Sequence, residues 1–156
     1  LRIGVSTAKG LCFALDKPLI AIETLESMAQ GIIAQNQIDA DMLLCPMIDA
    51  RRMEVYTALF DAQGNVVKPT SAEIIDEHSF SKQLQSHKIL FFGDGAAKCK
   101  TVLSSNINAQ FNTAFVNSAS HLTQKAADKY AAGQFEDMAY FEPFYLKDFL
   151  VTQKKS

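Results

Sequence analysis

The chain has 156 residues, a formal net charge of −2 and a hydrophobic content of 48%. This length accommodates one ordinary domain, or a small domain with part of another, and the apolar content excludes an intrinsically disordered chain. The slight negative charge argues against a protein that binds nucleic acid by itself. It does not argue against a subunit whose partner binds the nucleic acid. Because no apolar run reaches membrane-spanning length and no signal-peptide pattern is present, we expect a cytoplasmic protein with no membrane partner.

The first fifteen residues predict a helix that is apolar or small on nearly every face. Two stripes follow its helical spacing: Leu1, Val5, Ala8, Cys12 and Leu15 on one, and Gly4, Ala8 and Leu11 on the next. Such a helix must be covered on most sides. We therefore expect further structure to precede it, and another chain to cover part of it.

A short buried strand is predicted at 19–22, after Pro18 ends the first helix. Thr24 is expected to cap a second helix that frays by Asn36. The polar stretch 36–41 then predicts a boundary between two units, 1–38 and 39–156.

Three strands with short links follow, at 42–48, at 54–60 and from Val66 onward, and they predict an antiparallel meander. Pro69 favours an edge position for the third strand. Helices are predicted at 79–86, capped by Ser79, and at 96–103, and strands at 88–92 and 111–116. A last long helix is predicted, capped by Ser118 or Ser120 and ended by Gly133. Four of its residues are expected to face inward: Leu122, Ala126, Ala127 and Tyr130.

This order from residue 41 onward, βββαβαβα, is typical of one lobe of the actin-like ATPase and ribonuclease-H-like architecture. The fold class is therefore predicted as α/β, with one complete lobe and the remnant of another.

Charged residues gather around one strand end, where Asp49-Ala50-Arg51-Arg52 precedes Glu54. They could form a partner-facing or inter-lobe cluster, or a solvated turn with local ion pairs, which contributes little when exposed. The turn Gly93-Asp94-Gly95 could bring backbone N–H groups to a phosphate, but it falls short of a P-loop and has no lysine beside Asp94. A tight turn is the favoured interpretation.

Candidates for catalysis and metal binding are weak. No serine lies in a G-x-S-x-G motif, and three widely spaced cysteines predict buried thiols in a reducing compartment: Cys12, Cys45 and Cys99. The histidines are not paired at helical spacing, so no metal site is expected: His78, His87 and His121. Aromatic residues of the tail could stack on bases but are favoured as anchors of an extended C-terminal segment around Pro143: Tyr140, Phe141, Phe144, Tyr145 and Phe149.

Five motifs in chain order resemble those of the bacterial TsaB (YeaZ) family. They are Leu1-Arg2-Ile3-Gly4-Val5 with Ala8-Lys9-Gly10-Leu11, Pro18-Leu19-Ile20 with Thr24-Leu25-Glu26, Asp49-Ala50-Arg51-Arg52-x-Glu54-Val55-Tyr56, Gly93-Asp94-Gly95-Ala96, and Pro143-x-Tyr145-Leu146-Lys147. In the last motif Lys147 replaces the arginine usual in the family.

The resemblance implies a two-lobed actin-like protein from which the first sheet, first helix and a GSFTG-type turn are absent, so that the chain is an N-terminally truncated member. It also implies a non-catalytic subunit that supports a TsaD-like transferase in forming N6-threonylcarbamoyladenosine next to the anticodon of tRNA. ATP and metal would belong to partner subunits, with no cofactor in this chain. The chain would contact a TsaE-like ATPase and tRNA only as part of the complex, and it is expected to form a homodimer.

The predicted interface lies on the first helix, at Leu1, Gly4, Val5, Ala8, Leu11, Cys12 and Leu15. Two alternatives remain open: a nucleotide-binding or peptidase-like enzyme of the same superfamily, and a generic actin-fold interaction module with a different partner.

Overall fold

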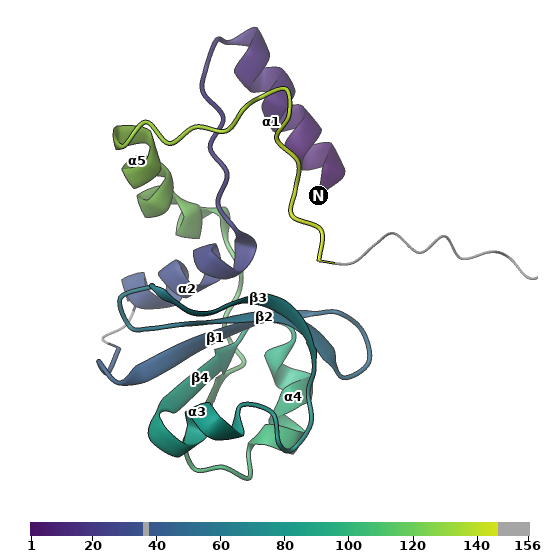
Figure 1. Cartoon of the computed structure of the whole chain (residues 1–156), viewed down its shortest axis with the longest axis vertical. Helices are drawn as coiled ribbons and strands as arrows, with labels where there is room; N and C mark the ends of the chain where they lie inside the picture. Colours follow the sequence, from purple (N-terminus) through teal and green to yellow (C-terminus); the bar gives the residue numbers. More distant parts are fainter. Residues whose placement is uncertain (36–37, 147–156) are drawn as a thin grey trace, which may run out of the picture.

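The computed structural model describes residues 1–35 and 38–146. Five strands form a single sheet, and helices cover both of its faces (Figure 1). Two further helices and the C-terminal segment lie beyond this layered part. We call the layered part the sheet lobe (α2, β1–β5, α3, α4 and η1) and the remainder the helical extension (α1, α5 and residues 133–146).

The sheet has the order β3-β2-β1-β4-β5. The strands are β1 (Met42–Asp49), β2 (Glu54–Phe60), β3 (Val66–Ile74), β4 (Lys88–Phe92) and β5 (Ala109–Asn112). β1, β2 and β3 are antiparallel neighbours, whereas β4 and β5 add in parallel. This confirms the predicted meander, and it places Pro69 on an edge strand, where a missing N–H is tolerated.

The register of β1 divides the core into two layers. Leu43, Cys45 and Met47 point to the face covered by α3 (Ser81–Ser86) and α4 (Ala96–Leu103), with Phe91 beside them. Leu44 points to the opposite face, which α2 (Thr24–Gln35) covers with four apolar residues: Leu25, Met28, Ala29 and Ile32. Both faces of the sheet are therefore sealed, as expected for strands that are apolar without interruption.

Close packing also joins α2 to η1 (Ala119–Leu122). The ring of His121 lies so near Gly31 that a Cβ there would approach its Cγ to 2.6 Å. Ser118, not Ser120, caps η1 and forms a capping box with His121. This contact between two elements far apart in the chain needs glycine on α2.

Four predictions about local structure are wrong. Residues 19–22 form no strand, since only Leu19 makes an isolated bridge, to Glu136. Ser79 does not cap α3: its hydroxyl bonds Asp76, and α3 begins after Phe80 in a left-handed conformation. The strand predicted at 111–116 is β5, which begins two residues earlier and ends four residues earlier. No residue of α5 (Thr123–Ala131) is buried, and Tyr130, expected to face inward, is exposed.

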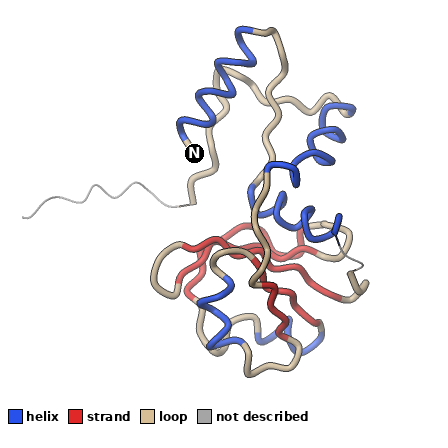
Figure 2. Tube along the Cα trace, turned by 180° about the vertical axis from the view of Figure 1, so that it is seen from behind, coloured by secondary structure: helices blue, strands red, loops and turns tan. Residues whose placement is uncertain are grey.

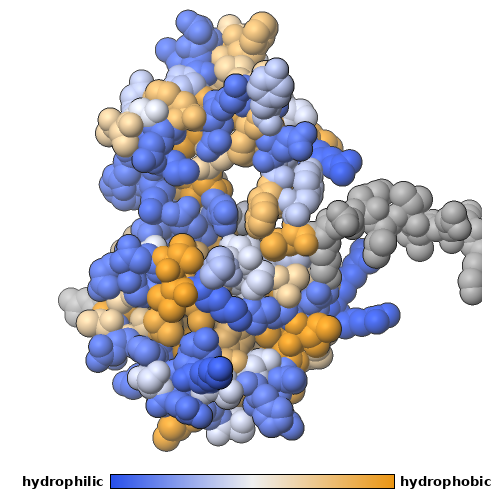
Figure 3. All heavy atoms as spheres, viewed as in Figure 1, coloured by the Kyte–Doolittle hydropathy of each residue, from blue (hydrophilic) through white to orange (hydrophobic). Residues whose placement is uncertain are grey.

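The helical extension contains helix and loop only, as Figure 2 shows from behind. α1 (Arg2–Ala14) has no buried residue, and Figure 3 shows a small opening between the extension and the sheet lobe. Although the sequence places α2 in the first unit and α5 in the second, α2 packs on the sheet and α5 does not. The boundary between 1–38 and 39–156 stays a prediction. Among the described helices, none is long and apolar enough to cross a membrane.

Candidate functional site

The predicted interface helix is confirmed as a helix, and most of its apolar surface is open to solvent. Ile3 is 85% exposed, Phe13 81% and Leu11 56%. An apolar side chain left in water forgoes about 1.5–3 kcal/mol of burial free energy. A helix with this surface is typical of one that packs against another protein segment.

One face of α1 is half-buried, and the C-terminal segment lies along it (Figure 1). The Lys9 ammonium donates hydrogen bonds to the carbonyl oxygens of Ala139 (3.2 Å) and Phe141 (3.0 Å). The Arg2 Nε donates to the Tyr145 hydroxyl at 3.3 Å, and its guanidinium lies 5.5 Å from the centre of that ring. Both cations of α1 thus bind the segment.

The predicted interface residues consequently divide between two faces of α1. Val5, Ala8 and Cys12 are half-buried on the side that carries Lys9. The others are exposed: Leu1 and Leu15 at the two ends of the same stripe, and Gly4 and Leu11 on the neighbouring one. Within the described ranges, therefore, the chain itself covers only part of the surface that the sequence assigned to a partner.

The charged residues around Asp49 form a network that ties β1, β2 and α4 together. The Lys98 ammonium bonds the Asp49 carboxylate and donates to the Glu54 carbonyl oxygen at 2.7 Å. The Asp49 carboxylate also accepts the Arg51 N–H at 2.8 Å. The hydrogen bond from Lys98, together with that from the Arg51 backbone, lowers the pKa of Asp49 below its ordinary value.

Sequence reasoning missed Lys98, which the structure brings to Asp49. No local pattern indicated this contact, because Lys98 lies on α4, 49 residues after Asp49 in the chain. Arg51 and Arg52 both adopt positive φ (73° and 49°), so the loop turns back tightly between β1 and β2. Tyr56 is half-buried on β2, paired with Ile48 of β1.

The Gly93-Asp94-Gly95 turn is packed against the end of β1. Gly93 has φ +99°, and a Cβ there would lie 2.5 Å from the Met47 carbonyl oxygen. The Gly95 N–H donates to that same oxygen at 3.0 Å, and the Asp94 carboxylate accepts the Asp49 N–H at 3.1 Å. Because the Gly95 N–H already has a partner, the geometry favours a structural turn over a phosphate-binding loop.

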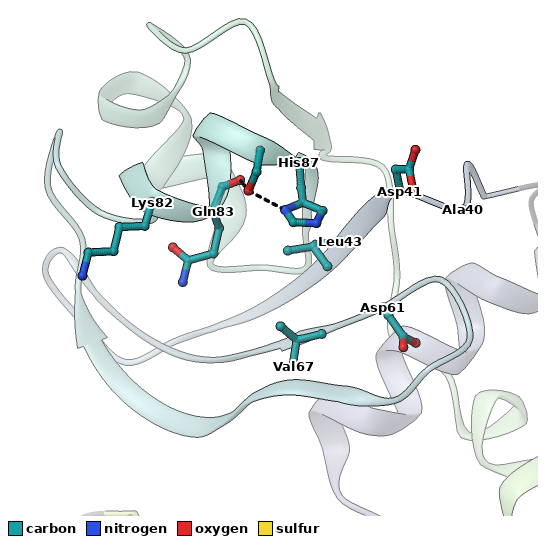
Figure 4. Close-up of a pocket in the computed structure, with 9 residues that line it drawn as sticks. Ala40, Asp41, Leu43, Asp61, Val67, Lys82, Gln83 and His87 are labelled. Atoms are coloured by element: carbon teal, nitrogen blue, oxygen red, sulfur yellow. Dashed lines mark hydrogen bonds between the residues drawn. The ribbon is translucent and has the colours of Figure 1, made fainter.

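A shallow pocket of about 350 Å³ opens between α3 and the first strands (Figure 4). At its rim, the Ser86 hydroxyl and His87 Nδ1 lie 2.8 Å apart. Among the described residues, none forms a hydrogen bond with His87 Nε2, so the pair lacks the third group that orients a base in a catalytic triad. Nor do the described ranges contain a cluster of three or more His, Cys, Asp or Glu that could hold a metal.

The motifs of the sequence thus meet in two places. Arg2 of the first motif binds Tyr145 of the last, next to the half-buried Pro143, and the Asp49 motif joins the Gly93 turn. Lys147 and Phe149, also singled out from the sequence, lie outside the described residues.

Comparison with known proteins identifies the family. The model of the family "TsaD: tRNA N6-adenosine threonylcarbamoyltransferase" matches residues 1–139. The tRNA threonylcarbamoyladenosine biosynthesis protein TsaB of Escherichia coli is 27% identical over 159 aligned residues, which cover 99% of this chain and 68% of that protein. The Bacillus subtilis protein of the same name is 38% identical over 68 residues, 44% of this chain and 28% of that protein.

Solved structures agree on the fold. YeaZ from Pseudomonas aeruginosa matches with a TM-score of 0.68 and 22% identity, over 93% of this chain and 67% of that chain. A protein described as similar to peptidase YeaZ, from the same organism, matches with a TM-score of 0.76 and 22% identity, over 94% and 67%. The fold class is thereby confirmed, and the chain belongs to the TsaD family and, within it, to the TsaB (YeaZ) proteins.

Proposed function

We propose that this chain takes part in forming N6-threonylcarbamoyladenosine in tRNA as a non-catalytic subunit that binds a TsaD-like transferase through α1. The exposed apolar surface of α1 around Gly4 carries this proposal, because a partner that covers Leu1, Leu11 and Leu15 removes them from water. The names of the TsaB relatives support the pathway.

The proposal assigns the remaining roles to other subunits. ATP and metal would bind the partners, a TsaE-like ATPase and tRNA would be met through the complex, and two copies of the chain would pair through the same helix. The occupied N–H groups of the Gly93 turn and the incomplete Ser86–His87 pair support a chain without its own catalysis.

The test replaces two glycines of α1 that differ mainly in the face they occupy. Both Gly4 and Gly10 have open space where a Cβ would stand, so leucine fits at either position in the isolated chain. Six residues separate them, which places them about 120° apart around the helix. Gly4 lies on the predicted interface face and Gly10 does not.

Gly4→Leu should weaken the affinity for the TsaD-like protein by about tenfold or more, because a side chain there separates the two backbones. Gly10→Leu should leave it unchanged. Calorimetric titration of both variants against the TsaD-like protein of the same organism measures the difference. Equal affinities for wild type and Gly4→Leu would reject this face of α1 as the interface.

A further inference from the structure

The C-terminal segment carries exposed aromatic residues directly beside α1. We propose that Tyr140 and Phe144 extend the α1 surface into one composite docking site, and that its occupant is a helix of the partner with an apolar stripe flanked by Lys or Arg. This inference rests on the proposed function and adds both a second contact element and the chemistry of the partner.

The anchoring of the segment is the first argument. It runs antiparallel to α1, since Lys9 binds the carbonyl oxygens of Ala139 and Phe141 while Arg2, seven residues earlier, binds Tyr145. A further hydrogen bond, from the Glu136 N–H to the Leu19 carbonyl oxygen (2.8 Å), holds the start of the segment. A segment fixed in this way loses little conformational freedom when a partner binds.

The direction of the side chains is the second argument. Phe141 and Pro143 are half-buried, whereas Tyr140 is 84% exposed and Phe144 67%. The polar bonds to α1 therefore fix the backbone and leave these two rings in water. Large aromatic side chains on a rigid support are typical of the residues that contribute most to protein interfaces.

Charge identifies the occupant. The ionisable carboxylates of the segment are Glu136, Asp137 and Glu142, and residues 133–146 include no Lys or Arg. Asp137 already accepts the N–H groups of Ala139 and Tyr140 at 2.8 and 3.0 Å, while the exposed Glu142 lies between the two rings in sequence. Together with Arg2 and Lys9 of α1, these three carboxylates give the composite surface one net negative charge, which favours a basic and apolar helix over the phosphates of an RNA strand.

The double variant Tyr140→Ala/Phe144→Ala tests the rings. Its affinity for the TsaD-like protein should fall by about tenfold or more, as expected when two contributing interface residues are lost. The matched control, Ile107→Ala/Val116→Ala, removes two exposed apolar side chains outside the helical extension and should leave the affinity unchanged. Circular dichroism of the full chain checks that each variant is folded.

Glu142→Gln tests the charge. Wild-type affinity should fall as salt concentration rises, and the variant should show a shallower dependence, since one interfacial charge is gone. An unchanged salt dependence would overturn the basic character of the occupant.

Three results would overturn the composite site, and they have different consequences for the proposed function. If Gly4→Leu weakens binding but the aromatic variant does not, the function stands and the composite site falls. Should the wild-type chain not bind the TsaD-like protein, both fall. If the aromatic variant loses affinity for tRNA alone while partner affinity is unchanged, the rings stack on RNA instead.

Discussion

The sheet lobe and the helical extension follow opposite rules of burial. In the sheet lobe Phe91, Phe92 and Leu44 are fully buried, and two apolar clusters seal both faces of the sheet. Neither α1 nor α5 of the extension has a buried residue, and α1 is joined to the segment beside it through hydrogen bonds of two cations. The buried core that stabilises the fold therefore lies in the sheet lobe, whereas the proposed binding surface lies in the helical extension, so the two can be changed separately.

The sharpest way to break this contrast is to exchange one aromatic residue for alanine in each part. Phe91 packs between Phe80 and Phe111, with ring centres 5.3 and 5.2 Å away. Phe91→Ala should lower the free energy of unfolding by about 3–5 kcal/mol, because it removes buried area and leaves a cavity. Phe13→Ala, at a side chain 81% exposed, should change it by no more than about 0.5 kcal/mol. Urea denaturation of both variants measures the difference, and similar losses would contradict the division.

A pair of glycines with positive φ gives a smaller effect. Gly93→Ala should cost about 1–3 kcal/mol from backbone strain, and more from the carbonyl oxygen of Met47, 2.5 Å from the new Cβ. Gly133 has φ +65° but nothing within 4 Å of a Cβ, so Gly133→Ala should cost only the backbone strain, about 1–2 kcal/mol. Thermal unfolding of the two variants under one set of conditions provides the comparison. A larger loss at Gly133 would show that the extension is part of the cooperative core.

The smallest expected effect concerns acid stability at Asp49. Its pKa is lower in the folded chain than in an unfolded one, because Lys98 and the Arg51 N–H bind the carboxylate. The interaction therefore stabilises the fold above the unfolded pKa of about 3.9, and is lost as pH falls through the lower folded-state value. Denaturation between about pH 5 and pH 2 should show a weaker pH dependence for Asp49→Asn.

Lys98→Met serves as the converse variant, since it removes the same ion pair from the other side. Its acid dependence should resemble that of Asp49→Asn. Wild-type behaviour in both would contradict a role for this pair.

Strong local patterns predicted most of the sheet lobe. The strands at β1, β2 and β4 are long apolar or alternating runs between turn residues, and Pro69 marked the edge before the sheet order was known. The strand predicted at 19–22 was wrong because this run, although apolar, has no neighbouring strand to pair with in the described part of the chain. Periodicity indicates burial, but pairing depends on residues elsewhere.

The sequence predicted that the candidate site is a helix, but it did not predict which other segment of the chain lies along that helix. Apolar spacing identified α1, yet nothing local indicated that Lys9 and Arg2 would hold a segment more than 120 residues later in the chain. The contacts of Lys98 with Asp49 and of His121 with Gly31 escaped for the same reason. Such pairs form through the tertiary fold, which a short stretch of sequence does not contain.

The placement of the thiols offers a practical route to observing α1 directly. Burial raises the pKa of both Cys45 and Cys99, which disfavours the thiolate that reacts with maleimides. Cys12 is half-buried on α1 and lies outside the core. A fluorophore attached there, with no engineered cysteine, would report on the surroundings of the helix and show whether the proposed partner changes them.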